Sequence, residues 1–473
     1  MNHPIAQAPI RAFDRAPLPP GFEAAARERF AERYSTGASV REQHGRDESP
    51  FLPMPPDAVI FAQSVEDVVA VVDWCRQYQV PLIPYGVGSS IEGSLLASQG
   101  GVSLDVSGMN RVLSIHAEDG TATVQPGVTR MQLNRELAGT GLFFPIDPGA
   151  DASIGGMCAT RASGTNAVRY GTMRENVVAL TVVTADGKVV RTARRARKSS
   201  AGYDLTRLFV GSEGTLGVIV EATVRLYPQP ESISAAVVSF PDVPSAINTV
   251  IQTIQMGVPI ARSEFLCERT IRAINAYQKT TMAERPTLFL EFHGTEAGVT
   301  EQIKMVESIA SELGGQNFEW ATRPEDRTRL WQARHHAYFA CLQVRPGSRA
   351  ISTDTCVPIS RLADSIEGAR HILDSAPMPS MLFGHVGDGN FHGIILVDPL
   401  DQAEVNEAER LNAEIVRLAL AVDGTCTGEH GVGLHKIDFL VEEHGDDTID
   451  LMRRIKRALD PVGILNPGKI FRA

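Results

Sequence analysis

Several features that often classify a protein are missing from this chain. It has no run of about 18 apolar residues, so no membrane-spanning helix is predicted. Its six cysteines form no CxxC pair and show no regular spacing, which favours reduced, mostly buried thiols over a disulfide framework. Basic residues are also outnumbered by acidic ones, 45 to 56. The net charge of −11 argues against nucleic acid or an anionic membrane surface as the main partner.

The rest of the composition is that of an ordinary globular protein. The 473 residues are 43% hydrophobic and 21% charged, and this length predicts two or three domains. The N-terminal stretch is rich in proline and has no uninterrupted apolar segment, so it is not expected to be a secretory signal. We expect a cytoplasmic protein, with peripheral membrane association left open. The basic run from Arg194 to Lys198 is predicted to be a solvated loop rather than an anion-binding patch.

Short strands and helices alternate up to about Pro228, which suits an α+β or α/β nucleotide-binding domain. Ser64 is a predicted N-cap for a helix that follows a β run at Val59 to Phe61. Apolar runs predict further strands at Leu82 to Tyr85, Val102 to Val106, Thr121 to Val124 and Val177 to Val183.

A boundary is predicted at Pro228-Gln229-Pro230. Beyond it, apolar patterns predict strands and helices in alternation: Ser234 to Phe240, Ser245 to Gln255, Leu288 to His293 and Thr300 to Leu313. This rhythm predicts an antiparallel sheet with helices on one face.

The segment Phe383 to His392, FGHVGDGNFH, carries the most specific chemical signal. Gly387 to Asn390 is a strong turn signal between two apolar runs, so we expect a β-hairpin. With those four residues as the loop, His385 faces His392, and directly opposed residues have Cβ atoms about 4.5–5.5 Å apart. The alternative is that each histidine is a hydrogen-bonded structural residue of a strand.

Two imidazoles in this arrangement can hold a divalent ion, and Glu429 of the later Thr427 to Gly431 patch could add a carboxylate. Two histidines and one carboxylate, with coordination positions left open, are typical of a catalytic metal site. Such a ligand set favours zinc, and manganese and iron are also compatible. His430 would stand beside the metal without being needed as a ligand.

Three loops rich in Gly, Ser and other small residues precede residue 220: Pro84 to Ser94, Pro148 to Gly164 and Gly211 to Ile219. Glycine lets a backbone approach a ligand closely and point its N–H groups at phosphate oxygens. The first loop lacks both the GxGxxG and the GK[ST] pattern, so it predicts neither NAD nor ATP. Together the loops fit an elongated, phosphate-bearing cofactor.

The order of these loops resembles the FAD-binding domain of the vanillyl-alcohol oxidase type, also called the p-cresol methylhydroxylase type. From Pro228 on, the chain is similar to the substrate domain of FAD-linked D-2-hydroxy acid oxidases. Four segments most resemble the cytochrome-linked D-lactate dehydrogenase branch: Trp331 to His336, Arg345 to Gly347, Asp354 to Arg361 and Gly424 to Gly433. The resemblance covers roughly residues 50–473.

The resemblance implies an α+β fold, with a two-part FAD-binding domain of the p-cresol methylhydroxylase type and an α+β substrate (cap) domain built on an antiparallel sheet. The expected limits are 1–50 for an N-terminal extension, 51–228 for the FAD-binding domain, 229–435 for the cap domain and 436–473 for a C-terminal segment that returns to the FAD domain.

It also implies which residues contact FAD. Those expected near the pyrophosphate are Gly86, Gly88, Ser89, Ser90 and Gly93. Those expected along the flavin and its ribityl chain are Pro148, Ser153, Gly156, Ser163 and Gly164, with Glu213 and Ile219 toward the adenine and Asn466 near the isoalloxazine ring. Pro84, Gly149 and Gly214 are also expected to contact FAD. FAD is expected to be non-covalent, because the first loop contains neither His nor Cys.

The implied reaction is oxidation of a D-2-hydroxy acid, D-lactate foremost, to the 2-keto acid by metal-assisted hydride transfer to flavin N5. His385, His392 and Glu429 would hold the metal, and His430 would be the general base. We expect Arg349, or else Arg334, to bind the substrate carboxylate.

The electron acceptor stays open among a cytochrome, a quinone, an electron-transfer flavoprotein and oxygen, as does a homodimer. Three alternatives for the function also remain. They are a D-2-hydroxyglutarate or glycolate dehydrogenase, an FAD oxidase of aromatic or sugar alcohols, and a non-catalytic flavin-binding electron-transfer subunit.

Overall fold

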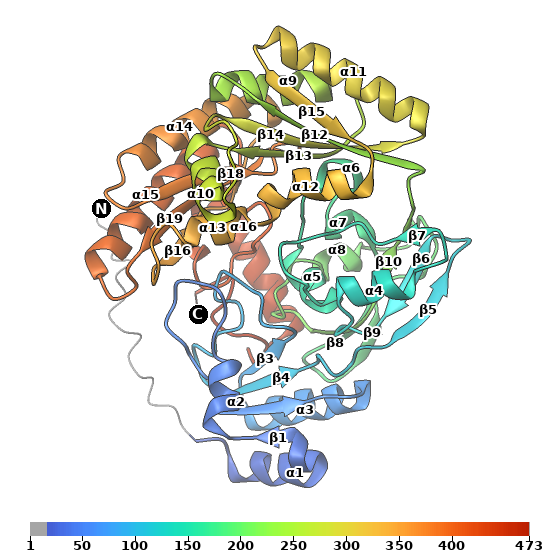
Figure 1. Ribbon diagram of the computed structural model, residues 1–473. Coiled ribbons are helices and arrows are strands. Elements are labelled where there is room, and N and C mark those ends of the chain that lie inside the picture. The colour runs from blue at the N-terminus through green and yellow to red at the C-terminus, as the bar shows by residue number, and fades with distance from the viewer. Residues whose placement is uncertain (1–16, 473) are drawn as a thin grey trace. The chain divides into compact units, whose positions relative to one another are not determined.

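The computed structural model describes residues 17–472, which form two compact units (Figure 1). The large-sheet unit consists of Gly164–Tyr170 and Pro230–Gly428. The glycine-loop unit consists of the described residues up to Ser163, of Gly171–Gln229, and of the residues from Glu429 onward. The expected domain limits at residues 50, 228 and 435 stay a prediction.

A small four-stranded sheet forms the first part of the glycine-loop unit. Its order is β1-β2-β4-β3, and both β2 and β3 run parallel to β4. The strands are β1 (Tyr34–Ser35), β2 (Ala58–Phe61), β3 (Leu82–Tyr85) and β4 (Val102–Asp105). Helices α1 (Pro20–Phe30) and α3 (Val65–Tyr78) pack on it, and α2 (Ala38–Gln43) precedes β2. As predicted, Ser64 caps α3, because its side chain accepts a hydrogen bond of 3.2 Å from the Asp67 N–H.

A five-stranded antiparallel sheet forms the second part of this unit, in the order β5-β6-β10-β8-β9. Its strands are β5 (Val112–His116), β6 (Thr121–Val124), β8 (Val177–Val183), β9 (Val189–Arg191) and β10 (Val218–Arg225). The other elements are α4 (Arg130–Glu136), β7 (Leu142–Phe143), α5 (Ile154–Thr160), α7 (Met173–Asn176), α8 (Leu205–Phe209), β11 (Tyr227–Pro228) and α16 (Ile437–Leu459). The two-part organisation of the first domain is therefore confirmed.

An eight-stranded antiparallel sheet forms the core of the large-sheet unit. The order is β15-β12-β14-β13-β18-β19-β16, with β17 also paired to β19. The strands are β12 (Ser232–Ser239), β13 (Ile260–Leu266), β14 (Thr287–Gly294), β15 (Gln316–Ala321), β16 (Arg349–Ser352), β17 (Thr355–Cys356), β18 (Ser380–Gly384) and β19 (Asn390–Val397). The predicted strands at Ser234 to Phe240 and Leu288 to His293 are confirmed, as is the antiparallel sheet.

Helices cover both faces of this sheet, so the expectation of helices on one face was wrong. On one face, α9 (Val243–Gln255), α11 (Glu296–Glu312), α14 (Leu362–Asp374) and α15 (Gln402–Leu420) pack against Phe292 and Ile395. On the other, α10 (Glu268–Gln278), α12 (Pro324–His335) and α13 (Ala337–Leu342) pack against Phe289 and Ile394. Every residue of β19 is buried, so side chains on both faces of this strand are shielded from water. A sheet that is buried on both faces needs a covering layer on each, which explains the two layers of helices.

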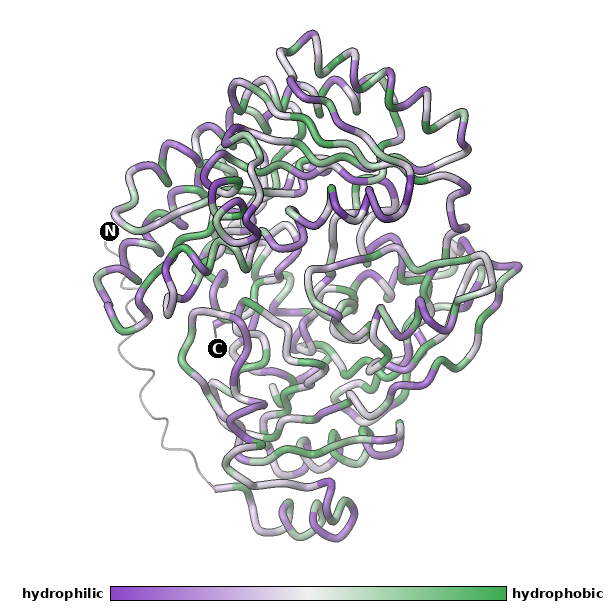
Figure 2. Tube along the Cα trace, in the orientation of Figure 1, coloured by the Kyte–Doolittle hydropathy of each residue, from purple (hydrophilic) through white to green (hydrophobic). Residues whose placement is uncertain are grey.

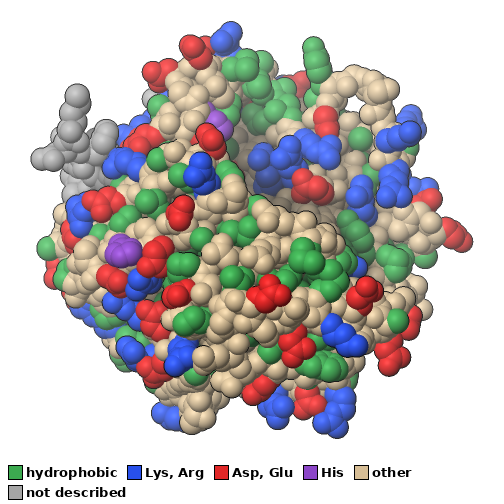
Figure 3. All heavy atoms as spheres, turned by 90° about the horizontal axis from the view of Figure 1, so that it is seen from above, with side chains coloured by type: hydrophobic (Ala, Val, Ile, Leu, Met, Phe, Trp, Pro, Cys, Tyr) green, Lys and Arg blue, Asp and Glu red, His purple; other side chains and the backbone are tan. Residues whose placement is uncertain are grey.

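Hydrophobic segments follow the strands of the large sheet in Figure 2, as expected for a sheet between two helical layers. On the face drawn in Figure 3, acidic side chains are interspersed among the basic ones. Five of the six cysteines are buried and all six are free, as predicted. In residues 17–472, no helix is long and apolar enough to cross a membrane.

Candidate functional site

The predicted hairpin is present, but its register differs from the one expected. Phe383, not His385, pairs with His392, and the loop consists of the five residues His385 to Gly389. Asn390 closes this loop by donating its N–H to the carbonyl of His385 (3.3 Å), and Gly389 adopts φ 88°. The register differs by two residues, and a shift by an even number keeps side chains on the same face. The rings of His385 and His392 therefore still meet, with centroids 5.4 Å apart.

Both histidines have Nδ1 directed at an oxygen acceptor. Nδ1 of His385 lies 2.7 Å from Oε1 of Glu264, and Nδ1 of His392 lies 3.1 Å from the carbonyl oxygen of Thr353. Since a carboxylate and a carbonyl can only accept, each Nδ1 carries the proton and each Nε2 keeps its lone pair. This is the arrangement that metal-binding histidines adopt, with the second ring nitrogen fixed by an outer hydrogen bond.

Glu264 of β13 joins His385 to Arg334 of α12. Its Oε2 accepts from both Nε and an Nη of Arg334 at 2.7 Å, and its side chain is fully buried. Burial by itself would raise the pKa of Glu264, but the charges and hydrogen bonds of His385 and Arg334 outweigh burial and lower it. The guanidinium of Arg334 also lies 5.1 Å from the ring of Phe383, the strand partner of His392.

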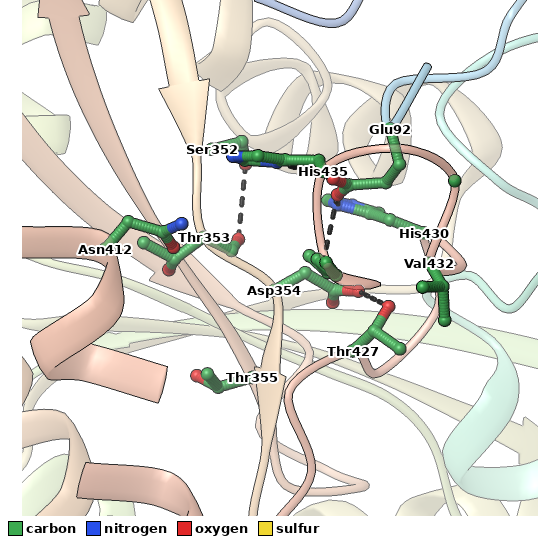
Figure 4. A network of polar contacts seen from close by, with 12 residues as sticks. Glu92, Ser352, Thr353, Asp354, Thr355, Asn412, Thr427, His430, Val432 and His435 are labelled. Atoms are coloured by element: carbon green, nitrogen blue, oxygen red, sulfur yellow. Dashed lines mark hydrogen bonds and ion pairs between the residues drawn. The ribbon is translucent and has the colours of Figure 1, made fainter. Parts of the chain in front are cut away.

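Glu429 begins the glycine-loop unit, but it follows Gly428 by one peptide bond. Gly428 is held within the large-sheet unit, because its N–H donates to the carbonyl of Asp354 (3.2 Å) and a Cβ there would lie 2.1 Å from Nδ2 of Asn390. Asp354 also accepts from the hydroxyl of Thr427 at 2.8 Å, which Figure 4 shows. His385, His392 and Glu429 are a group whose side chains can together hold a metal ion.

The structure does not bring Arg349 to the two histidines. Arg349 is exposed and pairs with Val397, five residues along β19 from His392. At about 3.3 Å per residue this separation is roughly 16 Å. The strand register, which the sequence did not reveal, therefore places Arg334 nearer to the histidine pair than Arg349, and the role of either residue in substrate binding stays a prediction.

The three glycine-rich loops converge within the glycine-loop unit. A Cβ at Gly86 would lie 2.6 Å from Oγ of Ser153, which joins the first loop to the second. Oγ of Ser94 donates to Glu213 (2.8 Å), which joins the first to the third. Asn466 donates to the carbonyl oxygens of Ser94 (3.0 Å) and Glu213 (2.7 Å), so the end of the chain meets the same loops.

Two local features fit a phosphate-bearing cofactor at these loops. Oγ of Ser90 is buried and has no hydrogen-bond partner among residues 17–472, so a ligand oxygen there would satisfy it. Gly88 has φ 78° and a Cβ there would lie 2.4 Å from Oη of Tyr85, so this turn requires glycine.

The other residues expected to contact FAD lie in the same unit, with one exception. Ser153 caps α5, because its Oγ accepts from the Gly156 N–H at 3.4 Å, and Ile219 is buried in β10. The other expected FAD contacts in the glycine-loop unit are Pro84, Ser89, Gly93, Pro148, Gly149, Ser163 and Gly214. Gly164 is the exception, because it begins the segment that belongs to the large-sheet unit.

The carboxylate of Glu213 binds the segment that follows His430. It accepts from the N–H groups of Val432 (2.7 Å) and Gly433 (2.9 Å) as well as from Ser94. Burial raises the pKa of Glu213 despite these hydrogen bonds. The side chain thus positions the chain next to His430, and its expected contact with adenine stays a prediction.

Glu92, in the first glycine-rich loop, faces His430 and two further cationic or ionisable groups. Its carboxylate lies 3.3 Å from Nδ1 of His430, 2.7 Å from Nδ1 of His435 and 3.0 Å from Nζ of Lys436. Figure 4 shows the rings of His430 and His435 turned toward this carboxylate. Burial favours the neutral form of Glu92, but the charge of Lys436 and the hydrogen bonds of the two histidines outweigh burial and lower its pKa.

Sequence reasoning missed three residues that shape these sites: Glu92, Glu264 and Lys436. Glu92 lies in the first glycine-rich loop, which the sequence did indicate. The one sequence signal for Glu92 itself was that it is a charged residue among glycines and serines. Glu264 is separated from His385 by 121 residues, and no local pattern marks it.

Comparison with known proteins identifies the family. The model for FAD linked oxidases, C-terminal domain, matches residues 229–470, and the model for an FAD binding domain matches residues 56–193. The chain is 53% identical to the probable mitochondrial D-lactate dehydrogenase of Danio rerio, over 93% of this chain and 89% of that protein. It is 48% identical to the mitochondrial D-lactate dehydrogenase [cytochrome] of Arabidopsis thaliana, over 93% of this chain and 78% of that one.

Among solved structures, p-cresol methylhydroxylase with bound substrate superposes with a TM-score of 0.75 at 19% identity, over 96% of this chain and 97% of that one. At this identity the likeness supports the fold, which is of the expected p-cresol methylhydroxylase type. The chain therefore belongs to the FAD-linked oxidases of that fold, and within them to the FAD-dependent dehydrogenases of D-2-hydroxy acids that include the D-lactate dehydrogenases.

Proposed function

We propose that this protein oxidises D-lactate to the corresponding 2-keto acid, with a divalent metal ion and non-covalent FAD. The observation that carries the proposal is the histidine pair of the large-sheet unit. Two imidazoles with centroids 5.4 Å apart each have Nδ1 at an oxygen acceptor, which leaves both Nε2 atoms as ligands. High identity to two D-lactate dehydrogenases supports D-lactate as the substrate.

His385, His392 and Glu429 would hold the metal, for which the ligand set favours zinc, with manganese or iron as alternatives. When bound, the metal supplies a Lewis acid for the substrate hydroxyl and FAD supplies the two-electron acceptor. Backbone of the glycine-rich loops and the Ser90 hydroxyl would bind the phosphates of FAD.

His430 is proposed to take the proton from the substrate hydroxyl. It follows Glu429 directly in the chain, so a ligand and the base come from adjacent residues. Its Nδ1 faces Glu92 at 3.3 Å, which favours the tautomer in which Nε2 accepts a proton. Arg334 is proposed to bind the substrate carboxylate, because its guanidinium lies beside the strand partner of His392 whereas Arg349 does not.

The experiment is anaerobic reduction of the bound flavin by a panel of hydroxy acids. We expect D-lactate to bleach the flavin absorbance fastest, ahead of D-2-hydroxyglutarate and glycolate, with L-lactate inactive. Fastest bleaching by D-2-hydroxyglutarate or glycolate would reassign the substrate. Bound FAD that no hydroxy acid bleaches would contradict the proposal and favour a non-catalytic electron-transfer subunit.

The electron acceptor and the location are proposed with the reaction. A cytochrome is the first choice, because one relative is named as a cytochrome-linked enzyme, and a quinone or an electron-transfer flavoprotein follows. Steady-state turnover with each acceptor in turn would separate them. Both relatives are named as mitochondrial, so the cytoplasmic location expected from the sequence stays a prediction, as does a homodimer.

A further inference from the structure

We propose that Glu264 is a positioning residue that fixes His385 as a metal ligand and Arg334 as the substrate clamp through one buried carboxylate. The inference deepens the proposed function and rests on its metal site. It concerns only residues of the large-sheet unit, which the structure describes together.

The first observation is that each oxygen of Glu264 has its own partner. Oε1 lies 2.7 Å from Nδ1 of His385, and Oε2 lies 2.7 Å from two nitrogens of Arg334. The exposed fractions of the three side chains are 0% for Glu264 and 12% for each partner. A carboxylate in this setting forms short, charge-assisted hydrogen bonds that fix the orientation of both partners.

The second observation is the strand register that places Glu264. On the neighbouring strands β13 and β18, Phe265 pairs with Gly384 and Leu266 with Phe383. One step further along the same register puts Glu264 level with His385, on the face covered by α12. β13 lies between β14 and β18 inside the sheet, so the carboxylate is attached to a rigid strand.

These contacts have two chemical consequences. A carboxylate at Nδ1 keeps the proton there, directs the Nε2 lone pair outward and raises its basicity, which strengthens a metal–imidazole bond. Arg334 supplies the positive charge that a buried carboxylate requires. A guanidinium has five N–H donors, and the edge held by Glu264 leaves donors on the other side for a substrate carboxylate.

A purely structural ion pair is the competing explanation, and the same sheet offers a matched control. Glu291 of β14 is also a buried carboxylate between a histidine and an arginine, with His293 at 2.8 Å and Arg262 at 3.5 Å. Glu291→Gln therefore removes the same charge from a similar buried pair, on the strand that lies on the other side of β13 from β18.

The test measures Zn²⁺ affinity by competition with a chromophoric chelator in the FAD-loaded protein. Mutation of an outer hydrogen-bond partner typically weakens metal binding by about 10–100-fold. We expect a loss in that range for Glu264→Gln, because it removes the negative charge and turns an amide NH₂ toward a donor of either His385 or Arg334. We expect Glu291→Gln to match the wild type. FAD content, read from the flavin absorbance, should be the same in all three proteins.

A double-mutant cycle separates action through His385 from general damage. Any Zn²⁺ binding that remains in a His385→Ala background, measured at raised Zn²⁺ concentration, should be weakened no further by Glu264→Gln, because its target is gone. Steady-state kinetics at saturating Zn²⁺ give a second readout. There, Glu264→Gln should raise KM for D-lactate more than it lowers kcat, because Arg334 loses its support.

The outcomes separate this inference from the function on which it rests. Wild-type protein that binds no Zn²⁺ contradicts the proposed metal site, and the inference with it. If the wild type binds Zn²⁺ and Glu264→Gln binds it with equal affinity, the inference is overturned while the proposed metal site stands. Equal losses of Zn²⁺ affinity in Glu264→Gln and Glu291→Gln would overturn it in the same way. If Glu264→Gln does not fold, Glu264→Asp replaces it, and unchanged Zn²⁺ affinity there also overturns the inference.

Discussion

Nζ of Lys436 lies 3.0 Å from Oε1 of Glu92, and the two side chains are 0% and 1% exposed. This buried ion pair joins the first glycine-rich loop to the residues just after His430. Removing one partner of a buried pair leaves an uncompensated charge and typically costs about 3–5 kcal/mol. We therefore expect Lys436→Met to lower the free energy of unfolding of the glycine-loop unit by about that amount, measured by urea denaturation.

The matched control for that prediction is Lys188→Met. Lys188 also pairs with an acid, Asp186 at 2.6 Å, but its side chain is 76% exposed. An exposed pair contributes about 0–1 kcal/mol, so the control should change little. Equal effects of the two substitutions would show that the Glu92 pair is not important for stability.

His430→Gln should lower kcat without loss of FAD. A positioned general base typically contributes about 10²–10⁴-fold, and glutamine cannot accept the proton. Flavin absorbance of the purified variant reports the FAD content, and His371→Gln is the control, because His371 is exposed on α14 and contacts its own helix. Turnover within a factor of a few of the wild type would remove His430 as the base.

Removal of the metal should abolish activity, and a ligand substitution should prevent its recovery. We expect a strong chelator to inactivate the enzyme and Zn²⁺ to restore it, whereas His392→Ala should neither retain metal nor recover. His293→Ala is the matched control, since His293 is equally buried in the same sheet, at 5% exposed, but bonds Tyr170 and Glu291. Full activity of metal-free protein would contradict the metal site.

Gly88→Ala should reduce the bound FAD. Gly88 has φ 78°, and a Cβ there would meet Oη of Tyr85 at 2.4 Å, so either the loop or the Tyr85 side chain must shift. Gly139→Ala is the control: its φ is 83°, but a Cβ there has no atom within 4 Å. Both variants carry the left-handed backbone penalty of about 1 kcal/mol. Only Gly88→Ala should lose flavin absorbance after gel filtration, and equal flavin content would remove this loop from the FAD site.

Lys469 should make stability depend on pH in the alkaline range. Burial lowers the pKa of Lys469 to about 8, while the unfolded chain keeps the ordinary value near 10.5. Between these values the unfolded state binds more protons, so the free energy of unfolding rises with pH, by at most about 1.4 kcal/mol per pH unit. Lys469→Met should lack this rise when unfolding midpoints are compared at pH 8 and pH 10. A parallel pH profile in the two proteins would contradict the assignment.

The sequence predicted elements that local patterns encode. β2, β8 and the N-cap of α3 depend on apolar runs and on Ser64, and these were found where expected. The hairpin was also predicted, but its register depends on how the loop after Gly384 closes. Because the loop has five residues and ends at Gly389, the observed strand register differs by two residues from the expected one.

The site was predictable where its residues carry their own chemistry, as His385 and His392 do. It was not predictable where a residue acts through a distant partner. Glu264 meets His385 across 121 residues and Glu92 meets His435 across 343, and such pairings follow from sheet order and chain return. The place of Arg349 was not predictable for the same reason, because only the β16–β19 register shows its distance from His392.

Neither unit is a continuous stretch of the chain, and this has a consequence for how the protein is made. The strand that begins the first glycine-rich loop forms a bridge from Leu82 to Leu465, and Asn466 fastens the loops themselves. Synthesis runs from the N-terminus, so the unit that is started first is the last to be completed. Until Leu465 and Asn466 have been synthesised, the nascent chain can complete its large sheet but not the contacts that join the three glycine-rich loops.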